Sequence, residues 1–130
     1  MSRLVLAMRS AGAFSILWAV YFLVDPSGAM EGWLADPALI NEASESAMRQ
    51  VGFAFMCIGG IHILLTIWEA DNLGKWAMAS GALWMIGGLL QINDVFVAEI
   101  AVQNGQTYFS LAMNYVIGGA LVYLGMQENE

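Results

Sequence analysis

The sequence predicts an all-α protein that crosses the membrane as a single antiparallel bundle of four helices. Of the 130 residues, 59% are hydrophobic and only 12% are charged, which is about half the charged fraction of a soluble domain. So much apolar surface cannot be hidden inside one small soluble domain. The apolar residues are also gathered in four long runs, which are Leu4–Val24, Val51–Trp68, Trp76–Ile92 and Phe109–Met126.

The first run, Leu4–Val24, is expected to form the first membrane helix. It begins close to Met1, but it is longer than the apolar part of a signal peptide, contains Arg9 and lacks a small-residue cleavage pattern, so we expect it to be retained. Like the other runs it has about 17 to 21 residues, the length that a helix needs to cross ~30 Å of hydrocarbon.

The later helices follow polar connections. After the turn DPSGAMEGW, Asp36 suits an N-cap and Pro37 a first helical residue, so we expect the second helix to start near Pro37 and to enter the membrane near Val51. The segments EADNLGK and VQNGQ contain the Gly and Asn residues of turns and bound the third run. We expect one domain over residues 1–130, without a flexible linker.

Small residues recur at a spacing of seven in each of the four runs. Glycine inside a helix costs about 1 kcal/mol relative to alanine, so the three copies of the tripeptide IGG need a structural reason. Seven residues are close to two helical turns, so both small residues share a face, and in lipid such faces allow backbones to approach at crossing angles of ~20°. The pairs are Gly12 and Ala19, Gly52 and Gly59, Gly81 and Gly88, and Gly118 and Gly125.

A weak internal similarity relates the two halves of the chain. The segment Ser10–Asp25 aligns with Ala79–Asp94, and Gly59-Gly60 aligns with Gly118-Gly119. A tandem duplication of a two-helix hairpin would place the halves around an axis along the membrane normal. Duplication and coincidence both stay open.

The charges limit both the partners and the orientation. A net charge of −7 repels phosphates, so no nucleic-acid partner is expected, and the lipid bilayer is the first expected partner. The positive-inside rule places Arg3, Arg9 and Lys75 on the cytoplasmic side and leaves Arg49 outside. This distribution predicts that both termini are cytoplasmic.

Polar residues within or beside the apolar runs are the candidate site residues, because burying them in lipid is costly. Counting ~1.5 Å of depth per residue sorts them into two layers. In the outer layer we expect Arg49 to pair with Asp94 or Asp25, either as a staple between helices or at the mouth of a binding cavity. The candidates of this layer are Arg49, Asp94, Asp25, Asn93, Gln91 and Asn114.

The inner layer contains Arg9, His62, Ser80 and Trp84. His62 shares a helix face with Gly59 and Thr66, so we expect it to point into a helix contact rather than at lipid. A core histidine with one satisfied ring nitrogen is the expected role, and a haem ligand, a proton relay and a quinone hydrogen-bond donor stay open.

No residue pattern points to catalysis. The runs carry no paired carboxylates at metal-ligand spacing, there is no cluster of Cys and His around the single Cys57, and no Ser-His-Asp arrangement is apparent. We therefore expect no metal, no other cofactor and no enzymatic activity.

The stretches LVDP, AMRQVGFAFMCIGGIHILL and GGLLQIND resemble the DoxX-like group of small four-helix bacterial membrane proteins. By that resemblance Asp25-Pro26, Arg49 and Asp94 match residues that these proteins often show, while Gly87 and Gln91 stand where the group would carry a further Arg. The resemblance implies the inner membrane of a bacterium or archaeon, with links to quinone-coupled sulfur oxidation and to assembly with other membrane proteins.

Packing faces and interfacial anchors are what a non-catalytic accessory or assembly subunit of a larger membrane complex needs, and this is the function that we expect. Its partners would be other membrane subunits or further copies of the chain. Two alternatives stay open: a site for a quinone or another lipid-like molecule, and an oligomeric channel or transporter. Polar groups that converge inside one bundle favour the first alternative, and polar groups that face outward along one helix favour the second.

Overall fold

The structure is a computed structural model that describes residues 1–128, and it is almost entirely helical. The predicted all-α class is confirmed: the described chain contains no strand, and one isolated bridge pairs Leu34 with Ala101. In chain order the elements are α1 (Arg3–Val24), α2 (Pro26–Glu31), the 3-10 helix η1 (Pro37–Leu39), α3 (Glu42–Ile67), α4 (Leu73–Ile92), the π-helix η2 (Asn93–Val97) and α5 (Gly105–Glu128).

Within residues 1–128, four helices are long and apolar enough to cross a membrane by length and composition. They are Arg3–Val24, Glu42–Ile67, Leu73–Val97 and Gly105–Glu128, so each predicted apolar run lies inside one of them, apart from the last residue of the second run. Each helix is longer than its run because hydropathy detects only the stretch suited to lipid, whereas the backbone hydrogen bonds continue into polar sequence.

The predicted start of the second long helix is wrong. Asp36 does cap a helical turn, since its Oδ1 accepts a hydrogen bond from the Ala38 amide at 2.9 Å, but that turn is the short η1. The long helix begins at Glu42, where Asn41 and Ser44 form a reciprocal capping box. Two amide donors are satisfied there at once, which makes this the stronger helix start.

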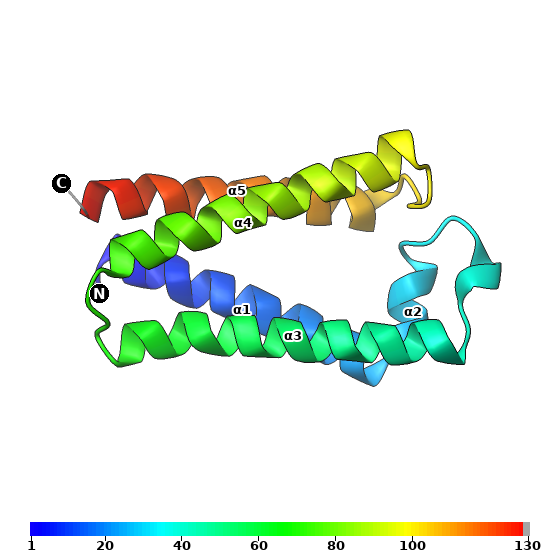
Figure 1. The fold of residues 1–130 in the computed structure, drawn as a ribbon, viewed down its shortest axis with the longest axis horizontal. Coiled ribbons are helices and arrows are strands. Elements are labelled where there is room, and N and C mark those ends of the chain that lie inside the picture. Colours follow the sequence, from blue (N-terminus) through cyan, green and yellow to red (C-terminus); the bar gives the residue numbers. More distant parts are fainter. Residues whose placement is uncertain (129–130) are drawn as a thin grey trace.

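The four long helices form two pairs (Figure 1). The helix α1 packs along α3, α4 packs along α5, and the pairs meet mainly through α1 and α5. Figure 1 shows the chain running in one direction along α1 and α4 and returning along α3 and α5, with both labelled ends at the same end of the molecule.

Glycines bring the backbones within each pair into direct contact. A Cβ added to Gly12 would lie 2.7 Å from the Gly59 carbonyl oxygen, and one added to Gly59 would lie 2.6 Å from the Gly12 oxygen. In the second pair, a Cβ on Gly81 would lie 2.5 Å from the Gly118 oxygen. No side chain fits at such distances from backbone atoms. We call Gly12–Gly59 and Gly81–Gly118 the two glycine contacts.

The surroundings of the two glycine contacts correspond as the internal alignment predicts. Ile16 lies against Gly59 as its aligned counterpart Met85 lies against Gly118. Likewise Ile63 approaches Gly12 and Val122 approaches Gly81. The two helix pairs therefore use the same packing at equivalent positions.

Candidate functional site

A cavity of about 620 Å³ lies between the two helix pairs, and we call it the amide cavity. Aromatic and aliphatic side chains from α1, α2, α3, α4 and the segment between α2 and α3 form most of its wall, and amide and hydroxyl side chains of α4 and α5 supply most of its polar part. Among the described residues, its lining includes no Lys, Arg, Asp or Glu. The cavity is therefore apolar with one uncharged polar wall, as small-molecule sites in proteins commonly are.

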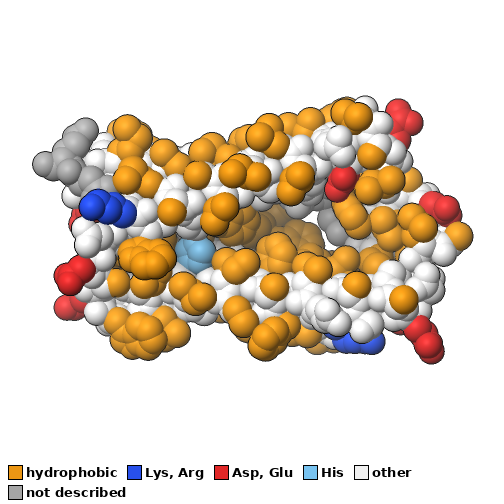
Figure 2. Space-filling view, viewed as in Figure 1, with side chains coloured by type: hydrophobic (Ala, Val, Ile, Leu, Met, Phe, Trp, Pro, Cys, Tyr) orange, Lys and Arg blue, Asp and Glu red, His pale blue; other side chains and the backbone are white. Residues whose placement is uncertain are grey.

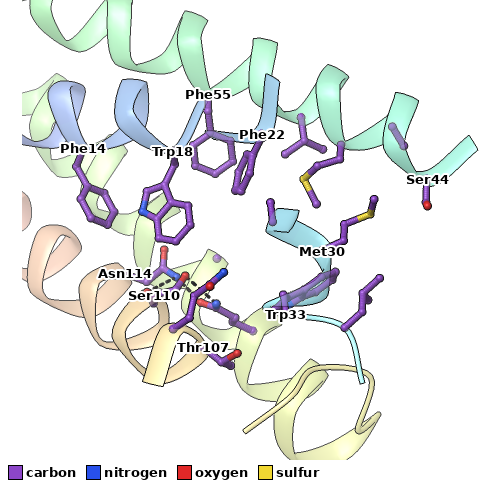
Figure 3. A pocket seen from close by; sticks show the side chains of 18 of the residues that line it. Phe14, Trp18, Phe22, Met30, Trp33, Ser44, Phe55, Thr107, Ser110 and Asn114 are labelled. Carbon is purple, nitrogen blue, oxygen red and sulfur yellow. Dashed lines mark hydrogen bonds between the residues drawn. The ribbon is translucent and has the colours of Figure 1, made fainter. Parts of the chain in front are cut away.

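The aromatic wall of the amide cavity comes largely from α1. Phe14, Trp18 and Phe22 are four residues apart, so they lie on one face of the helix. The ring centroids of Phe14 and Trp18 are 6.1 Å apart, those of Trp18 and Phe22 are 5.6 Å apart, and Phe22 meets Phe55 of α3 edge-on at 5.7 Å. These contacts hold the rings in place around the cavity (Figure 3).

The polar wall is a cluster of three side chains, Gln91, Ser110 and Asn114. Gln91 Nε2 donates a hydrogen bond to Ser110 Oγ at 2.9 Å, and Gln91 Oε1 accepts one from Asn114 Nδ2 at 2.7 Å. Ser110 and Asn114 are four residues apart on α5 and both face Gln91 on α4. Figure 3 shows Trp18 pointing toward this cluster from the opposite wall.

The cluster keeps hydrogen-bonding capacity on its cavity side. Asn114 Nδ2 also donates to the Ser110 carbonyl oxygen at 3.2 Å, so both of its hydrogens are engaged. Its Oδ1 has no hydrogen-bond donor among residues 1–128, and it lies beside Gly87, where an added Cβ would be 3.6 Å away. Asn114 Oδ1 is thus able to accept a hydrogen bond from a group inside the cavity.

Two buried hydroxyl groups lie beside the cavities without a hydrogen-bond partner in the described chain. They belong to Thr107, which lines the amide cavity and is 1% exposed, and to Ser15, which is fully buried. An unpaired buried hydroxyl costs about 1–3 kcal/mol. Thr107 therefore places a hydroxyl group without a hydrogen-bond partner on the same cavity wall region as the Gln91, Ser110 and Asn114 cluster.

A second cavity of about 390 Å³ lies between α3 and α4, and we call it the lateral groove. Figure 2 shows a hollow between the two pairs on this face, with the single histidine visible at its edge. The groove and the amide cavity share four lining residues, Phe55, Trp84, Gly87 and Asn114, which we call the junction. The two spaces are therefore adjoining parts of one site.

His62 connects the two helix pairs across the lateral groove. Its Nδ1 lies 2.7 Å from the Ile58 carbonyl oxygen, which can only accept, so Nδ1 carries a hydrogen. Its Nε2 lies 2.6 Å from Ser80 Oγ on α4, and in the neutral ring it accepts the Ser80 hydroxyl hydrogen. Both ring nitrogens are engaged and the residue is 6% exposed, which is the geometry of a core histidine.

The predicted inner layer is brought together except for one residue. His62, Ser80 and Trp84 all line the lateral groove. Arg9 does not line it; its Nε donates to Thr66 Oγ1 at 2.9 Å and so ties α1 to α3.

The structure brings only some residues of the predicted outer layer together. Gln91 and Asn114 line the amide cavity, whereas Arg49, Asp25, Asn93 and Asp94 line neither cavity. The expected ion pair of Arg49 with Asp94 or Asp25 is absent, and the structure records no ion pair anywhere in residues 1–128. The Arg49 side chain is exposed.

Local structure explains why the acids do not meet Arg49. Asp25 caps α2, with its Oδ1 accepting from the Gly28 amide at 3.1 Å. Asn93 and Asp94 follow α4, which packs along α5, whereas Arg49 is on α3, which packs along α1. A depth count gives the height of a residue in the membrane but not the direction in which it points.

Two features of the amide cavity, its aromatic wall and Ser110, are not among the residues that the sequence predicts for a site. The four-residue spacing of Phe14, Trp18 and Phe22 was a usable signal, because three large rings on one helix face indicate a common surface. The same spacing of Ser110 and Asn114 marks a polar face on α5.

Comparisons with family models, curated proteins and solved structures find no match for this chain.

Proposed function

We propose that this chain is an integral membrane protein that binds one uncharged, lipid-like molecule in the amide cavity. The observation that carries the proposal is the uncharged cluster of Gln91, Ser110 and Asn114 on the wall of an otherwise apolar, aromatic cavity. The cluster lies inside a single chain, and polar groups that converge inside one bundle favour a ligand site over a pore between chains.

The wall chemistry defines the polar end of the ligand. Asn114 Oδ1 accepts a hydrogen bond, and the ring faces of Trp18 and Phe14 suit a flat or compact group. No cation in the described lining is available to pair with a phosphate or carboxylate, and burying such an anion unpaired is costly. A quinol or a similar hydroxylated lipid meets these conditions, whereas a quinone has no hydroxyl hydrogen to donate to Asn114 Oδ1.

We place the protein in the bilayer as an antiparallel bundle made of two repeated helix pairs, with both termini in the cytoplasm. Large apolar side chains such as Leu17, Leu89 and Val116 are exposed and line neither cavity, as lipid-facing side chains would be. The matching glycine contacts support a repeat, and the positions of Arg3, Arg9 and Lys75 support the orientation.

The roles of accessory subunit and of oligomeric channel stay predictions, as does the resemblance to DoxX-like proteins. A ligand site and an accessory role are compatible, because a small subunit can present a bound lipid to a larger complex. An enzymatic activity is not proposed.

Replacing Gln91 by Leu is expected to reduce the small molecule that co-purifies with the protein. Leu is close to Gln in size but cannot hold Asn114 in place, and losing about 1 kcal/mol of hydrogen bonding reduces affinity roughly fivefold. The measurement is mass spectrometry of the organic extract from protein purified in mild detergent, with the molecule quantified per mole of protein.

The matched control is Gln127→Leu, because Gln127 is exposed near the end of α5 and bonds only Tyr123 in the described chain. This variant should retain the parental amount of co-purified molecule. Equal retention by Gln91→Leu and the parent would contradict the proposed site.

A further inference from the structure

Gly87 occupies the junction between the amide cavity and the lateral groove. It lines both spaces, together with Phe55, Trp84 and Asn114. The neighbouring Gly88 packs against the Tyr115 ring, where an added Cβ would lie 2.7 Å from a ring carbon. At Gly87, by contrast, a Cβ would meet only Asn114 Oδ1 at 3.6 Å, an ordinary contact. Helix packing therefore does not require glycine at position 87, where a larger side chain would extend into the junction.

The lateral groove beyond the junction is lined mainly by carbon. Ile58, Ile61, Leu65 and Leu83 contribute to its walls. His62 Nε2 and the Ser80 hydroxyl form a hydrogen bond with each other, so a molecule in the groove does not have to supply a hydrogen-bond partner for them. Along α4 the groove extends from Gly87 to Trp76, which is about 16 Å at 1.5 Å per residue. An elongated apolar chain fits such a surface.

The amide cavity and the lateral groove adjoin each other but differ in the chemistry of their walls. The amide cavity offers an uncharged hydrogen-bonding wall, and the lateral groove offers a hydrocarbon surface that is open between α3 and α4. Neither space contains a Lys or Arg within the described lining, which disfavours a phospholipid because its phosphate would have no cation to pair with.

We infer that the ligand is a single-chain amphiphile whose uncharged head lies against Gln91 and Asn114 and whose hydrocarbon chain passes Gly87 into the lateral groove. This inference rests on the proposed function and adds the ligand's chemical class and its path. The absence of a side chain at Gly87 is what lets one molecule occupy both spaces.

The test measures quenching of tryptophan fluorescence by a brominated lipid in phosphatidylcholine nanodiscs. The probe is the glycerol monoester of 9,10-dibromostearic acid, whose mid-chain bromines would lie beside Trp84 and Trp76 in the groove. Phosphatidylcholine with the same brominated chains is the comparison probe. The parent should show quenching that saturates at low mole fraction of the monoester, on top of the linear quenching that both lipids cause.

Gly87→Leu places a side chain in the junction, so it should weaken the saturable component by at least about tenfold in apparent affinity. Gly87→Ala, which meets no close contact, should fold normally and show a smaller loss in the same direction. The matched control is Gly119→Leu, since a Cβ at Gly119 meets no atom within 4 Å, and it should bind like the parent.

Two results would overturn the inference. One is unchanged saturable quenching in both Gly87 variants, which would leave a ligand site but remove the path through the junction. The other is purely linear quenching in the parent, equal for both brominated lipids. The co-purification test of Gln91→Leu is independent of the path, so it shows separately whether the proposed function fails.

Discussion

Gly59→Leu is expected to unfold the protein or to separate α1 from α3 in detergent. The Gly59 position touches backbone on its neighbour, since an added Cβ would lie 2.6 Å from the Gly12 carbonyl oxygen and 2.7 Å from Ile16 Cγ1. A backbone atom cannot rotate away as a side chain can, so the helices must move apart. Overpacking typically costs about 1–3 kcal/mol, and we expect the loss here to reach or exceed the upper value. Thermal unfolding in detergent, followed with size-exclusion chromatography, measures it.

The next residue provides the control for this prediction. A Cβ at Gly60 meets no atom within 4 Å, so Gly60→Leu adds the same side chain one position away without a collision. It should melt close to the parent. Gly88→Leu is expected to be intermediate, because its collision is with the Tyr115 side chain, which can rotate. If Gly59→Leu also melts like the parent, the glycine contacts do not hold the helix pair together.

Cysteine labelling of intact cells is expected to give an all-or-none difference between the two ends of α3. In a Cys57→Ser background, Glu42→Cys should react with a membrane-impermeant maleimide, and Asp71→Cys should react only after permeabilisation. Both residues are exposed and lie at or just beyond opposite ends of the helix. The reason is the placement of Arg3, Arg9 and Lys75 on the cytoplasmic side.

Two other labelling patterns would contradict this arrangement. Reaction of Asp71→Cys alone in intact cells would reverse the orientation while keeping the span. Reaction of both positions without permeabilisation would mean that α3 does not cross the membrane.

The positions of the four long helices along the chain were predictable from the sequence. Apolar runs locate the four long helices because lipid compatibility is a property of each segment alone. The start of α3 was not predicted, because Asp36-Pro37 and Asn41 both carry helix-start signals. Choosing between them requires knowing that Asn41 and Ser44 satisfy each other's backbone amides.

The depth of a residue in the membrane is enough to predict some contacts of the candidate site. Contacts that also depend on the direction in which a side chain points do not follow from depth alone. His62 and Ser80 were assigned to one layer and do form a hydrogen bond, and Gln91 and Asn114 were grouped and do meet. Arg49 was assigned to the same layer as the acids, but its side chain is exposed. Two residues at one height meet only if their helices pack together and turn the side chains toward each other, and α3, which carries Arg49, packs along α1 rather than along α4.

Native mass spectrometry of the parent protein, released from the mildest detergent that keeps it folded, shows whether the chain holds a neutral lipid-like molecule. We expect an additional mass of one small uncharged amphiphile per chain, which is lost when the protein is denatured. Bare protein under conditions that preserve folding, or adducts of phospholipid alone, would contradict a site for one neutral lipid-like molecule in the amide cavity.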